Sequence, residues 1–345
     1  MTKVYVGMSG GVDSSLTAAL LKEQGYDVTG VYMKNWTQDL PGMKCPWADD
    51  LADAKRVAVQ LGIDFKVFDF ENEYKHKVVD YMIEEYKLGR TPNPDIMCNQ
   101  EVKFKLFLET SLEDGADMIA TGHYARVEDG VLKQAVDANK DQTYFLYRVT
   151  GEALKKTLFP LGEFTKPTVR EMAKERGLYT AAKKDSQGIC FVGQIGIREF
   201  LSQYVEQVAG PIIDKKSGKV LGQHDGAIFY TIGQRHGLEL GGGLPYYVVG
   251  KDMDKNEVYV TTDLNDDTLW KPVLNLSSVH WINGKPTEGE LTIRVRHRAK
   301  LAKAQLRFEN DDVILSLNDP ERAVAAGQSV VIYDGNICIG GGIVS

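Results

Sequence analysis

A short glycine-rich segment, residues 9–14, constrains the fold of this chain more than any other feature. It reads Ser-Gly-Gly-Val-Asp-Ser and stands between an apolar run at residues 4–7 and a helical pattern at residues 14–24. Adjacent glycines let the backbone turn tightly, so that its N–H groups approach phosphate oxygens, and the positive end of a following helix adds to the attraction. The segment therefore predicts a phosphate-binding loop between the first strand and the first helix of an α/β sheet.

The side chains of this segment fit the same interpretation. Ser9 and Ser14 supply hydroxyl donors, and Asp13 is placed either to cap the helix or to help hold Mg²⁺ against a pyrophosphate. The segment lacks the Gly-Lys-Ser/Thr of loops that serve cleavage between the β- and γ-phosphates, and it is not a G-x-G-x-x-G dinucleotide fingerprint. A plain glycine turn is the alternative, which we disfavour because placement and residue types agree at every position.

The pattern of apolar and polar residues changes part-way along the chain. Residues 1 to about 125 alternate apolar runs with helical patterns, which is typical of a parallel α/β sheet. Further strands are expected at residues 28–33, 65–70 and 118–120, and helices at residues 49–61 and 165–177. From about residue 210 short runs separated by turn residues replace the helical pattern, and Asp334-Gly335 is a hairpin signal. These runs lie at residues 246–249, 257–261, 291–298, 313–317 and 329–333.

The fold class predicted from this organisation is α/β with a second, all-β part. We expect a parallel-sheet domain at residues 1–198, a small linking domain at residues 199–270, and a C-terminal antiparallel β-barrel or sandwich at residues 271–345. Ligands of open α/β sheets bind at the carboxyl ends of the strands, so the turn at residues 121–123 after the predicted strand 118–120 belongs to the expected site.

Composition narrows the class of protein. The length of 345 residues favours two or three domains, and 43% hydrophobic with 26% charged residues is ordinary for a globular protein. The net charge of −7 argues against a general nucleic-acid binder but leaves room for a local basic patch. No apolar run approaches membrane-spanning length and the first strand begins at once, so we expect a cytoplasmic location.

The four cysteines, Cys45, Cys98, Cys190 and Cys338, form no C-x-x-C pair. A disulfide framework or a zinc site is therefore not expected. Each cysteine taken alone is more often a buried small apolar residue than a nucleophile, and Cys45 and Cys338 are assigned that role.

Cys98 and Cys190 have more distinctive surroundings. Cys98 lies in residues 91–99, which we expect to be a loop stiffened by two prolines, with Asp95 three residues before the thiol. Cys190 follows a pair of lysines at residues 183–184. Their positive charge favours the thiolate form of the cysteine.

Together these motifs resemble a known family. The glycine loop resembles the pyrophosphate loop (PP-loop) of the ATP-pyrophosphatase superfamily, whose members adenylate a substrate and release pyrophosphate. The motifs come in the order found in bacterial tRNA-specific 2-thiouridylases, and the resemblance covers essentially the whole chain. They are residues 9–14, 93–99, 121–124, 141–146, 186–191, 233–238 and 340–343.

The resemblance implies a role for each matching position. ATP, with Mg²⁺, would be bound by Gly7, Met8, Ser9, Gly10, Gly11, Val12, Asp13, Ser14, Met33 and Gly122. The target base would be held by Asn93, Pro94 and Asp95. Cys190 would carry a persulfide, supplied by a sulfur carrier or a cysteine desulfurase, and Cys98 would be the partner nucleophile. The tRNA would contact His123, Lys140, Asp141, Gln142, Arg296, His297 and Gln328, although His297 stands where the family often has tyrosine.

The chemistry is coherent without the family. The C2 oxygen of uridine is a poor leaving group, and adenylation converts it to AMP, which leaves readily. A persulfide then attacks the activated carbon, and a second thiol cleaves the S–S bond by thiol–disulfide exchange. Asp95 is expected either to act as a general base or to cap its own loop. The alternatives are another ATP-pyrophosphatase, either a small-molecule ligase or a tRNA modifier without a persulfide, and a non-catalytic RNA-binding protein regulated by ATP.

A basic segment supports the RNA interpretation. Residues 291–308 contain six Lys or Arg and no Asp or Glu. Arg294, Arg296, Arg298 and Lys300 alternate with other residues, and a strand would place all four charges on one face. We favour a contact with the tRNA backbone over a solvated face paired with acids on a neighbouring strand.

Overall fold

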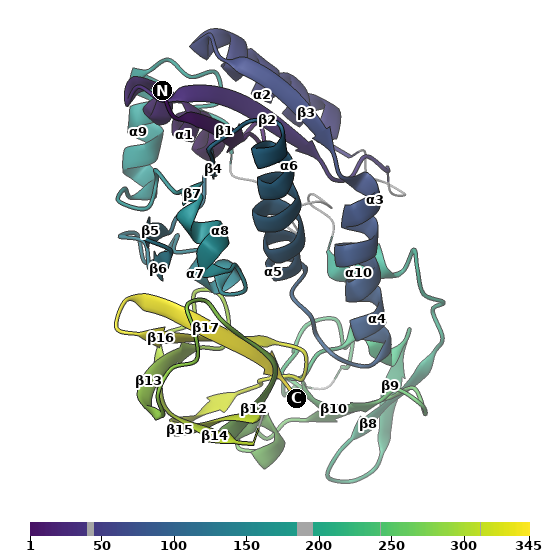
Figure 1. The fold of residues 1–345 in the computed structure, drawn as a ribbon. Helices are drawn as coiled ribbons and strands as arrows, with labels where there is room; N and C mark the ends of the chain where they lie inside the picture. Colours follow the sequence, from purple (N-terminus) through teal and green to yellow (C-terminus); the bar gives the residue numbers. More distant parts are fainter. Residues whose placement is uncertain (40–44, 185–195, 242, 311) are drawn as a thin grey trace.

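A parallel sheet carries the glycine-rich loop. The computed structural model describes residues 1–39, 45–184, 196–241, 243–310 and 312–345. The sheet has the strand order β3-β2-β1-β4-β7, and its neighbouring strands are parallel (Figure 1). Its strands are β1 (Lys3–Gly7), β2 (Asp27–Lys34), β3 (Asp64–Asp69), β4 (Met118–Ala120) and β7 (Thr157–Leu158). The prediction of a parallel α/β domain is confirmed.

Helices cover both faces of this sheet because side chains of β1 alternate in direction. Val4 and Val6 belong to one apolar cluster with residues of the first helix, whereas Tyr5 belongs to a second cluster with Phe107. The helices concerned are α1 (Val12–Glu23), α2 (Trp47–Leu61) and α6 (Phe107–Glu113), and α9 (Lys166–Glu175) packs on α1.

Two longer helical runs contain π-helical turns. The first comprises α3 (Glu71–Tyr74), η1 (Lys75–Asp80) and α4 (Tyr81–Lys87), and the second comprises α5 (Pro94–Met97), η2 (Cys98–Leu106) and α6. The predicted loop over residues 91–99 is therefore wrong in its second half. Asn93 accepts hydrogen bonds from the N–H groups of Asp95 and Ile96, and Pro94 suits the first turn, so a helix begins there.

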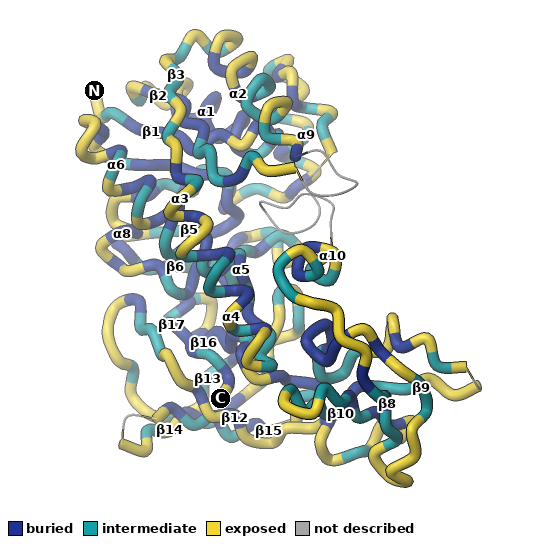
Figure 2. The backbone as a smooth tube through the Cα atoms, turned by 90° about the vertical axis from the view of Figure 1, so that its right-hand side faces the viewer, coloured by how far each residue is buried: buried dark blue, intermediate teal, exposed yellow. Residues whose placement is uncertain are grey.

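The central domain is a small sheet with the strand order β10-β11-β8-β9. Its strands are β8 (Gly210–Asp214), β9 (Val220–His224), β10 (Tyr247–Asp252) and β11 (Glu257–Thr261), and the helical turns around it are α10 (Ile197–Leu201), η3 (Ala227–Phe229) and η4 (Asp267–Leu269). Val248, Val258 and Val260 are buried in its core, whereas the turn between β8 and β9 is exposed (Figure 2).

The C-terminal strands close into a barrel. They follow the order β12-β15-β14-β13-β16-β17, and a further pairing of β12 with β17 completes the ring. The strands are β12 (Trp270–Trp281), β13 (Gly289–Arg294), β14 (Ala302–Glu309), β15 (Asp312–Arg322), β16 (Ser329–Asp334) and β17 (Ile337–Val344). The predicted barrel is confirmed, and so is the hairpin, since Asp334 pairs with Ile337.

The barrel joins the N-terminal domain through one of its own strands. A hairpin of β5 (Arg126–Glu128) and β6 (Val131–Lys133) continues the barrel sheet, with Ile337 and Cys338 of β17 opposite β6. Nearby, α7 (Thr143–Leu146) and α8 (Gly151–Lys155) approach the barrel. The hydroxyl of Tyr144 donates to the carbonyl of Ser329 at 3.0 Å, which ties this segment to the start of β16.

The strand predicted at residues 291–298 is confirmed only as far as Arg294, and the shared basic face is wrong. Strand β13 ends at Arg294, and Arg298 has a φ of +64°, a left-handed conformation that breaks the alternation. Arg296 and Arg298 are exposed in the following turn, whereas Arg294 is buried. The four charges therefore do not share one strand face.

Arg294 is buried because it pairs with Asp141 across the domain boundary. Its Nη1 lies 2.8 Å from Oδ2 of Asp141, and the two side chains are 8% and 1% exposed. The hydroxyl of Thr143 donates to the same carboxylate oxygen at 2.8 Å, and the N–H of Ala135 donates to the other oxygen at 3.1 Å. A carboxylate so enclosed holds two parts of the chain together.

We predict that Arg294→Met lowers the free energy of unfolding by about 3–5 kcal/mol, because it leaves the buried Asp141 charge unpaired. Urea denaturation measures this change. The matched control is Lys155→Gln, which breaks an exposed pair with Glu152 and should change stability by less than about 1 kcal/mol. Equal effects of the two substitutions would contradict a structural role for the buried pair.

Candidate nucleotide and thiol site

The glycine loop opens into a cavity of about 450 Å³ at the carboxyl ends of β1, β2 and β4. The predicted ATP-binding residues that line it are Gly7, Met8, Ser9, Gly11, Val12, Asp13, Ser14, Met33 and Gly122. Gly10 is not among the lining residues. Its φ is +71°, and a Cβ on Gly10 would lie 2.4 Å from the carbonyl oxygen of Asp50, so glycine is required for the loop to pass α2.

The loop is held in shape by its own side chains. The backbone N–H of Ser9 donates to Oγ of Ser14 at 3.2 Å, and this hydroxyl donates to the carbonyl of Gly11 at 3.2 Å. Gly11 is the N-cap of α1, and among the described residues no side-chain capping hydrogen bond is made at this position. The expectation that Asp13 caps the helix is therefore wrong, and the first residues of α1, Val12, Asp13 and Ser14, line the cavity.

Asp13 instead binds a lysine from α9. Nζ of Lys166 lies 2.7 and 2.8 Å from the two carboxylate oxygens of Asp13, and the hydroxyl of Tyr124 donates to Oδ1 at 2.9 Å. Lys166 is only 8% exposed. Asp50, the other carboxylate that lines the cavity, is paired in the same way with Lys183 at 2.7 Å.

These pairs bear on the expected Mg²⁺. Magnesium sites in nucleotide enzymes use one or two carboxylates together with the phosphates. Both carboxylates that line this cavity are held by lysines, and no cluster of three metal-ligating side chains occurs within the described residues. The described residues thus do not offer Mg²⁺ an open carboxylate.

The second turn of the site requires a close approach of two backbones. A Cβ on Gly122 would lie 2.8 Å from the backbone nitrogen of Ser14. Only glycine lets the turn after β4 pack this tightly on the start of α1. Asn35, at the end of β2, also lines the cavity, and its buried Oδ1 has no hydrogen-bond partner among the described residues. The cavity is therefore shaped by backbone and retains an unused acceptor.

Cys98 lies in the wall of the same cavity. It is 1% exposed and is the first residue of η2. Asn93, Pro94 and Asp95 lie just before it but are not among the lining residues. Cys190 lies outside the described residues.

The other two cysteines differ from each other. Cys338 of β17 is 1% exposed between the barrel and the N-terminal domain, and burial, reinforced by the charge of Asp141, raises the pKa of its thiol well above the ordinary range. The prediction of a buried apolar role is confirmed for Cys338. Cys45 is also buried, and burial raises the pKa of its thiol, but it lines the cavity, which the sequence did not indicate.

The residues predicted to contact tRNA separate into two groups. Those that line the cavity are His123, Lys140, Gln142 and His297. The others are already engaged. Asp141 is enclosed with Arg294, Nη2 of Arg296 donates to the carbonyl of Arg322 at 2.7 Å, and Oε1 of Gln328 accepts from the N–H of Ala325 at 3.1 Å.

Both histidines of this wall are uncharged at neutral pH. Burial, followed by the nearby charge of Lys103, holds the pKa of His123 well below its ordinary value. Burial, followed by the charges of Arg298 and Arg294, lowers the pKa of His297 to about 4. The ring of His297 lies 4.5 Å from that of Phe145, so it contributes a flat aromatic surface to the wall.

Sequence reasoning missed several residues of the cavity. They are Tyr32, Asn35, Trp36, Trp47, Asp50 and Lys103 in the wall, and Lys166 behind Asp13. Tyr124, Lys184 and Arg298 also line the wall, and each lies in a segment that the sequence singled out without assigning it to this cavity. Lys166 could not be predicted locally, because only the packing of α9 against α1 brings it to Asp13.

Comparison with known proteins decides the family. Residues 2–194 match a family model described as a tRNA methyl transferase HUP domain, residues 198–262 one described as a tRNA methyl transferase PRC-barrel domain, and residues 272–344 one described as an aminomethyltransferase β-barrel domain. A Bacillus cereus protein named tRNA-specific 2-thiouridylase MnmA is 49% identical over 348 residues, which is 99% of this chain and 94% of that protein. This chain belongs to the tRNA-specific 2-thiouridylase family.

A second curated relative agrees with this placement. A Staphylococcus saprophyticus protein of the same name is 49% identical over 349 residues, which cover 99% of this chain and 94% of that one. A solved U34-tRNA thiolase from Methanococcus maripaludis shares 19% identity, with 59% of this chain and 65% of that one covered and a TM-score of 0.38. No helix among the residues placed in the structure is both long and apolar enough to cross a membrane.

The close approach at Gly122 gives a prediction for this 2-thiouridylase family member. Gly122→Ala should raise the KM for ATP by roughly tenfold or more, because the methyl group displaces the start of α1. Initial rates at varied ATP concentration measure it. Gly241→Ala is the control, since a Cβ there meets nothing within 4 Å. An unchanged KM in Gly122→Ala would separate the turn after β4 from nucleotide binding.

Proposed function

We propose that this protein uses ATP to replace the C2 oxygen of the wobble uridine of tRNA with sulfur. One observation carries the proposal: a phosphate-type loop and the Cys98 thiol lie in the walls of a single cavity. Adenylation needs the first, and sulfur transfer needs the second. Methyl transfer, which the descriptions of the matching family models mention, needs neither in this combination.

The first half of the reaction is an adenylation. ATP is bound through residues 9–14, with its phosphates at the N–H groups of the loop and of α1. The uridine C2 oxygen attacks the α-phosphorus, and pyrophosphate leaves. Mg²⁺ would be supplied together with the nucleotide, because the paired Asp13 offers it no open carboxylate. Asn93, Pro94 and Asp95 hold the base, with Asp95 as general base or as a positioning group.

The second half is a sulfur transfer. A persulfide on Cys190, loaded by a sulfur carrier or a cysteine desulfurase, supplies the nucleophile that attacks C2, and AMP leaves with the former uridine oxygen. Cys98 attacks the S–S bond, so that the terminal sulfur remains on the base and a Cys98–Cys190 disulfide forms. A thiol reductant then restores both thiols.

The direct test combines the protein with ATP, Mg²⁺, a persulfide donor and unmodified tRNA. We expect AMP and pyrophosphate in equal amounts, only when tRNA is present, and a uridine heavier by the exchange of one oxygen for sulfur. Mass analysis of digested nucleosides and chromatography of the nucleotides provide the readouts. Formation of ADP and phosphate would contradict the mechanism, and AMP without any thiolated base would favour a different ATP-pyrophosphatase.

The two motif cysteines give a second prediction. Cys98→Ser and Cys190→Ser should each abolish thiolation, because a hydroxyl can neither carry a persulfide nor cleave one. The control is Cys338→Ser, which changes a thiol buried between the barrel and the N-terminal domain and absent from the cavity wall. Thiolated uridine produced at the normal rate by Cys190→Ser would remove the persulfide assignment.

The exposed basic turn of the barrel gives a third prediction. Replacing Arg298 and Lys300 together with Gln should weaken tRNA binding. The plot of log affinity against log salt should become shallower by roughly one unit or more. Lys303→Gln is the control on the same barrel, because Lys303 already pairs with Glu290 at 3.0 Å. Identical salt slopes for the wild type, the double variant and the control would show that this turn is a solvated surface without a tRNA contact.

A further inference from the structure

The three domains meet at the short connection between α4 and α5. Residues 90–93 have no helix or strand conformation. They lead directly into Asn93, Pro94 and Asp95, which are proposed to hold the target base. Thr91 lies at the centre of this connection and contacts both other domains.

The barrel reaches Thr91 through its backbone. The N–H of Thr91 donates to the carbonyl of Ala326 at 2.8 Å. The next barrel residue, Gly327, has a φ of +87°, and a Cβ there would lie 2.7 Å from the nitrogen of Thr91 and 2.8 Å from Cβ of Arg90. The two backbones are therefore packed with no room for a methyl group.

The central domain reaches the same residue through a side chain. Oγ1 of Thr91 lies 3.2 Å from Oγ1 of Thr231, in a hydrogen bond between the two hydroxyls. Thr231 is itself fixed, since its N–H donates to Oε1 of Gln234 at 3.1 Å. On the other side of the connection, a Cβ on Gly89 would lie 2.9 Å from Cγ of Met253, so the central domain packs closely there as well.

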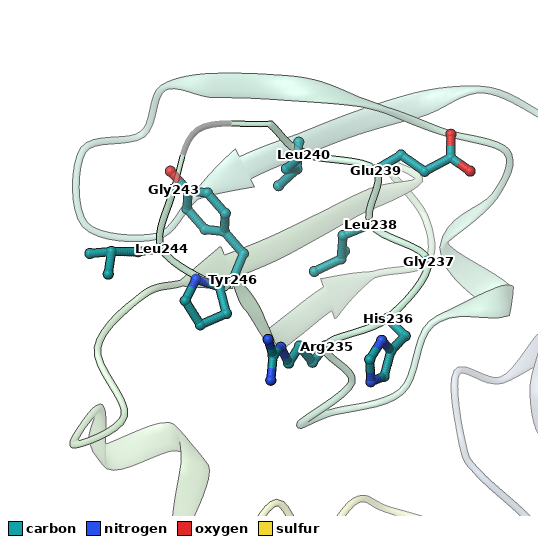
Figure 3. Close-up of a pocket in the computed structure, with 10 residues that line it drawn as sticks. Arg235, His236, Gly237, Leu238, Glu239, Leu240, Gly243, Leu244 and Tyr246 are labelled. Atoms are coloured by element: carbon teal, nitrogen blue, oxygen red, sulfur yellow. The ribbon is translucent and has the colours of Figure 1, made fainter.

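These contacts involve motifs that no part of the chemistry uses. Gln234 belongs to the Gly-Gln-Arg-x-Gly-Leu motif, and the two residues after it, Arg235 and His236, are exposed at one end of a pocket of about 320 Å³ (Figure 3). On the barrel side, Gln328 follows Gly327. Each turn that holds Thr91 thus continues into polar residues on an outer domain.

The connection is also joined rigidly to residues that lie closer to the cavity. Pro92 and Pro94 restrict the backbone on both sides of Asn93, whose side chain caps α5. Helix α5 continues without a break into η2, which begins at Cys98 in the cavity wall. A displacement of Thr91 therefore moves the base-holding residues and the thiol together.

We propose that Thr91 is a positioning residue: the barrel and the central domain, through Ala326 and Thr231, set the place of the base-holding residues relative to the ATP cavity. The proposal rests on the proposed function. It explains why a segment with no secondary structure is clamped by two outer domains, and it makes the seating of tRNA on those domains a condition for correct presentation of the base.

The test uses Thr91→Val and Thr231→Val. Each removes one hydroxyl while keeping the shape of the side chain. Each should lower the single-turnover thiolation rate about fivefold, the effect of one lost hydrogen bond, with unchanged affinities for tRNA and ATP. The double variant should be no slower than either single variant, because the same contact is lost. Thr168→Val is the matched control, since it breaks another pair of threonine hydroxyls, with Thr165 at 2.9 Å.

The barrel contact is tested by Gly327→Ala. It should lower the rate more than the valine variants, because the added methyl group meets the backbone of Thr91. Gly335→Ala is the control on the same barrel: its φ is +58°, but a Cβ there meets nothing within 4 Å. Thermal melting of each variant separates a local effect on the rate from general destabilisation.

A measurement independent of thiolation completes the test. Cys98 is buried, so its alkylation by iodoacetamide, followed by peptide mass, reports how firmly the segment after Thr91 is held. Thr91→Val should increase alkylation of Cys98 about fivefold and leave Cys338 unchanged. Normal rates and normal alkylation in both valine variants overturn the proposal, as does a loss of tRNA affinity or melting temperature that accounts for the lower rate. A wild-type protein that makes no thiolated uridine contradicts the proposed function, while the alkylation result still decides the role of Thr91.

Discussion

The buried ion pair of Asp141 and Arg294 holds the N-terminal domain and the barrel in the relative position on which the site depends. The two residues lie on different domains, 2.8 Å apart, and almost no solvent reaches either side chain. Lys140 and Gln142 flank Asp141, and His297 and Arg298 follow Arg294, and all four line the cavity at the glycine loop. One ion pair, between residues 153 positions apart in the chain, therefore aligns two walls of the cavity. Because an unpaired charge there is strongly unfavourable, the walls are held in register by electrostatics as well as by packing.

The charges around the nucleotide loop follow a related logic. Asp13 and Asp50 would repel a triphosphate, but each is held by a lysine, Lys166 and Lys183 respectively. Paired in this way, the carboxylates shape the cavity without adding net negative charge to it. His123 and His297 are neutral, so their rings contribute surface rather than charge to the cavity.

The sequence predicted what depends on neighbours along the chain. The loop at residues 9–14, the strand at 118–120 and the hairpin at 334–335 each follow from local residue types, and the structure contains all three. It misjudged what depends on distant packing. The strand predicted through Arg298 ends at Arg294, which is buried against a partner 153 residues away, and the left-handed backbone of Arg298 breaks the alternation. Lys166 was missed because only the docking of α9 brings it to Asp13, and Asp141 was assigned to the tRNA because nothing local shows that it is enclosed.

Besides its pairing with β16, the last strand of the barrel has two different neighbours along its length. Near its end β17 pairs with β12 and closes the ring, whereas at Ile337 and Cys338 it pairs with β6 of the N-terminal domain. An isolated barrel would expose this part of the strand as an unpaired edge, with the apolar Cys338 uncovered, and such edges promote aggregation. The barrel is thus complete as a sheet only when the N-terminal domain is present. Cutting the chain between its domains would not yield independent modules, and a gene fusion that borrowed this barrel would have to bring the β5–β6 hairpin with it.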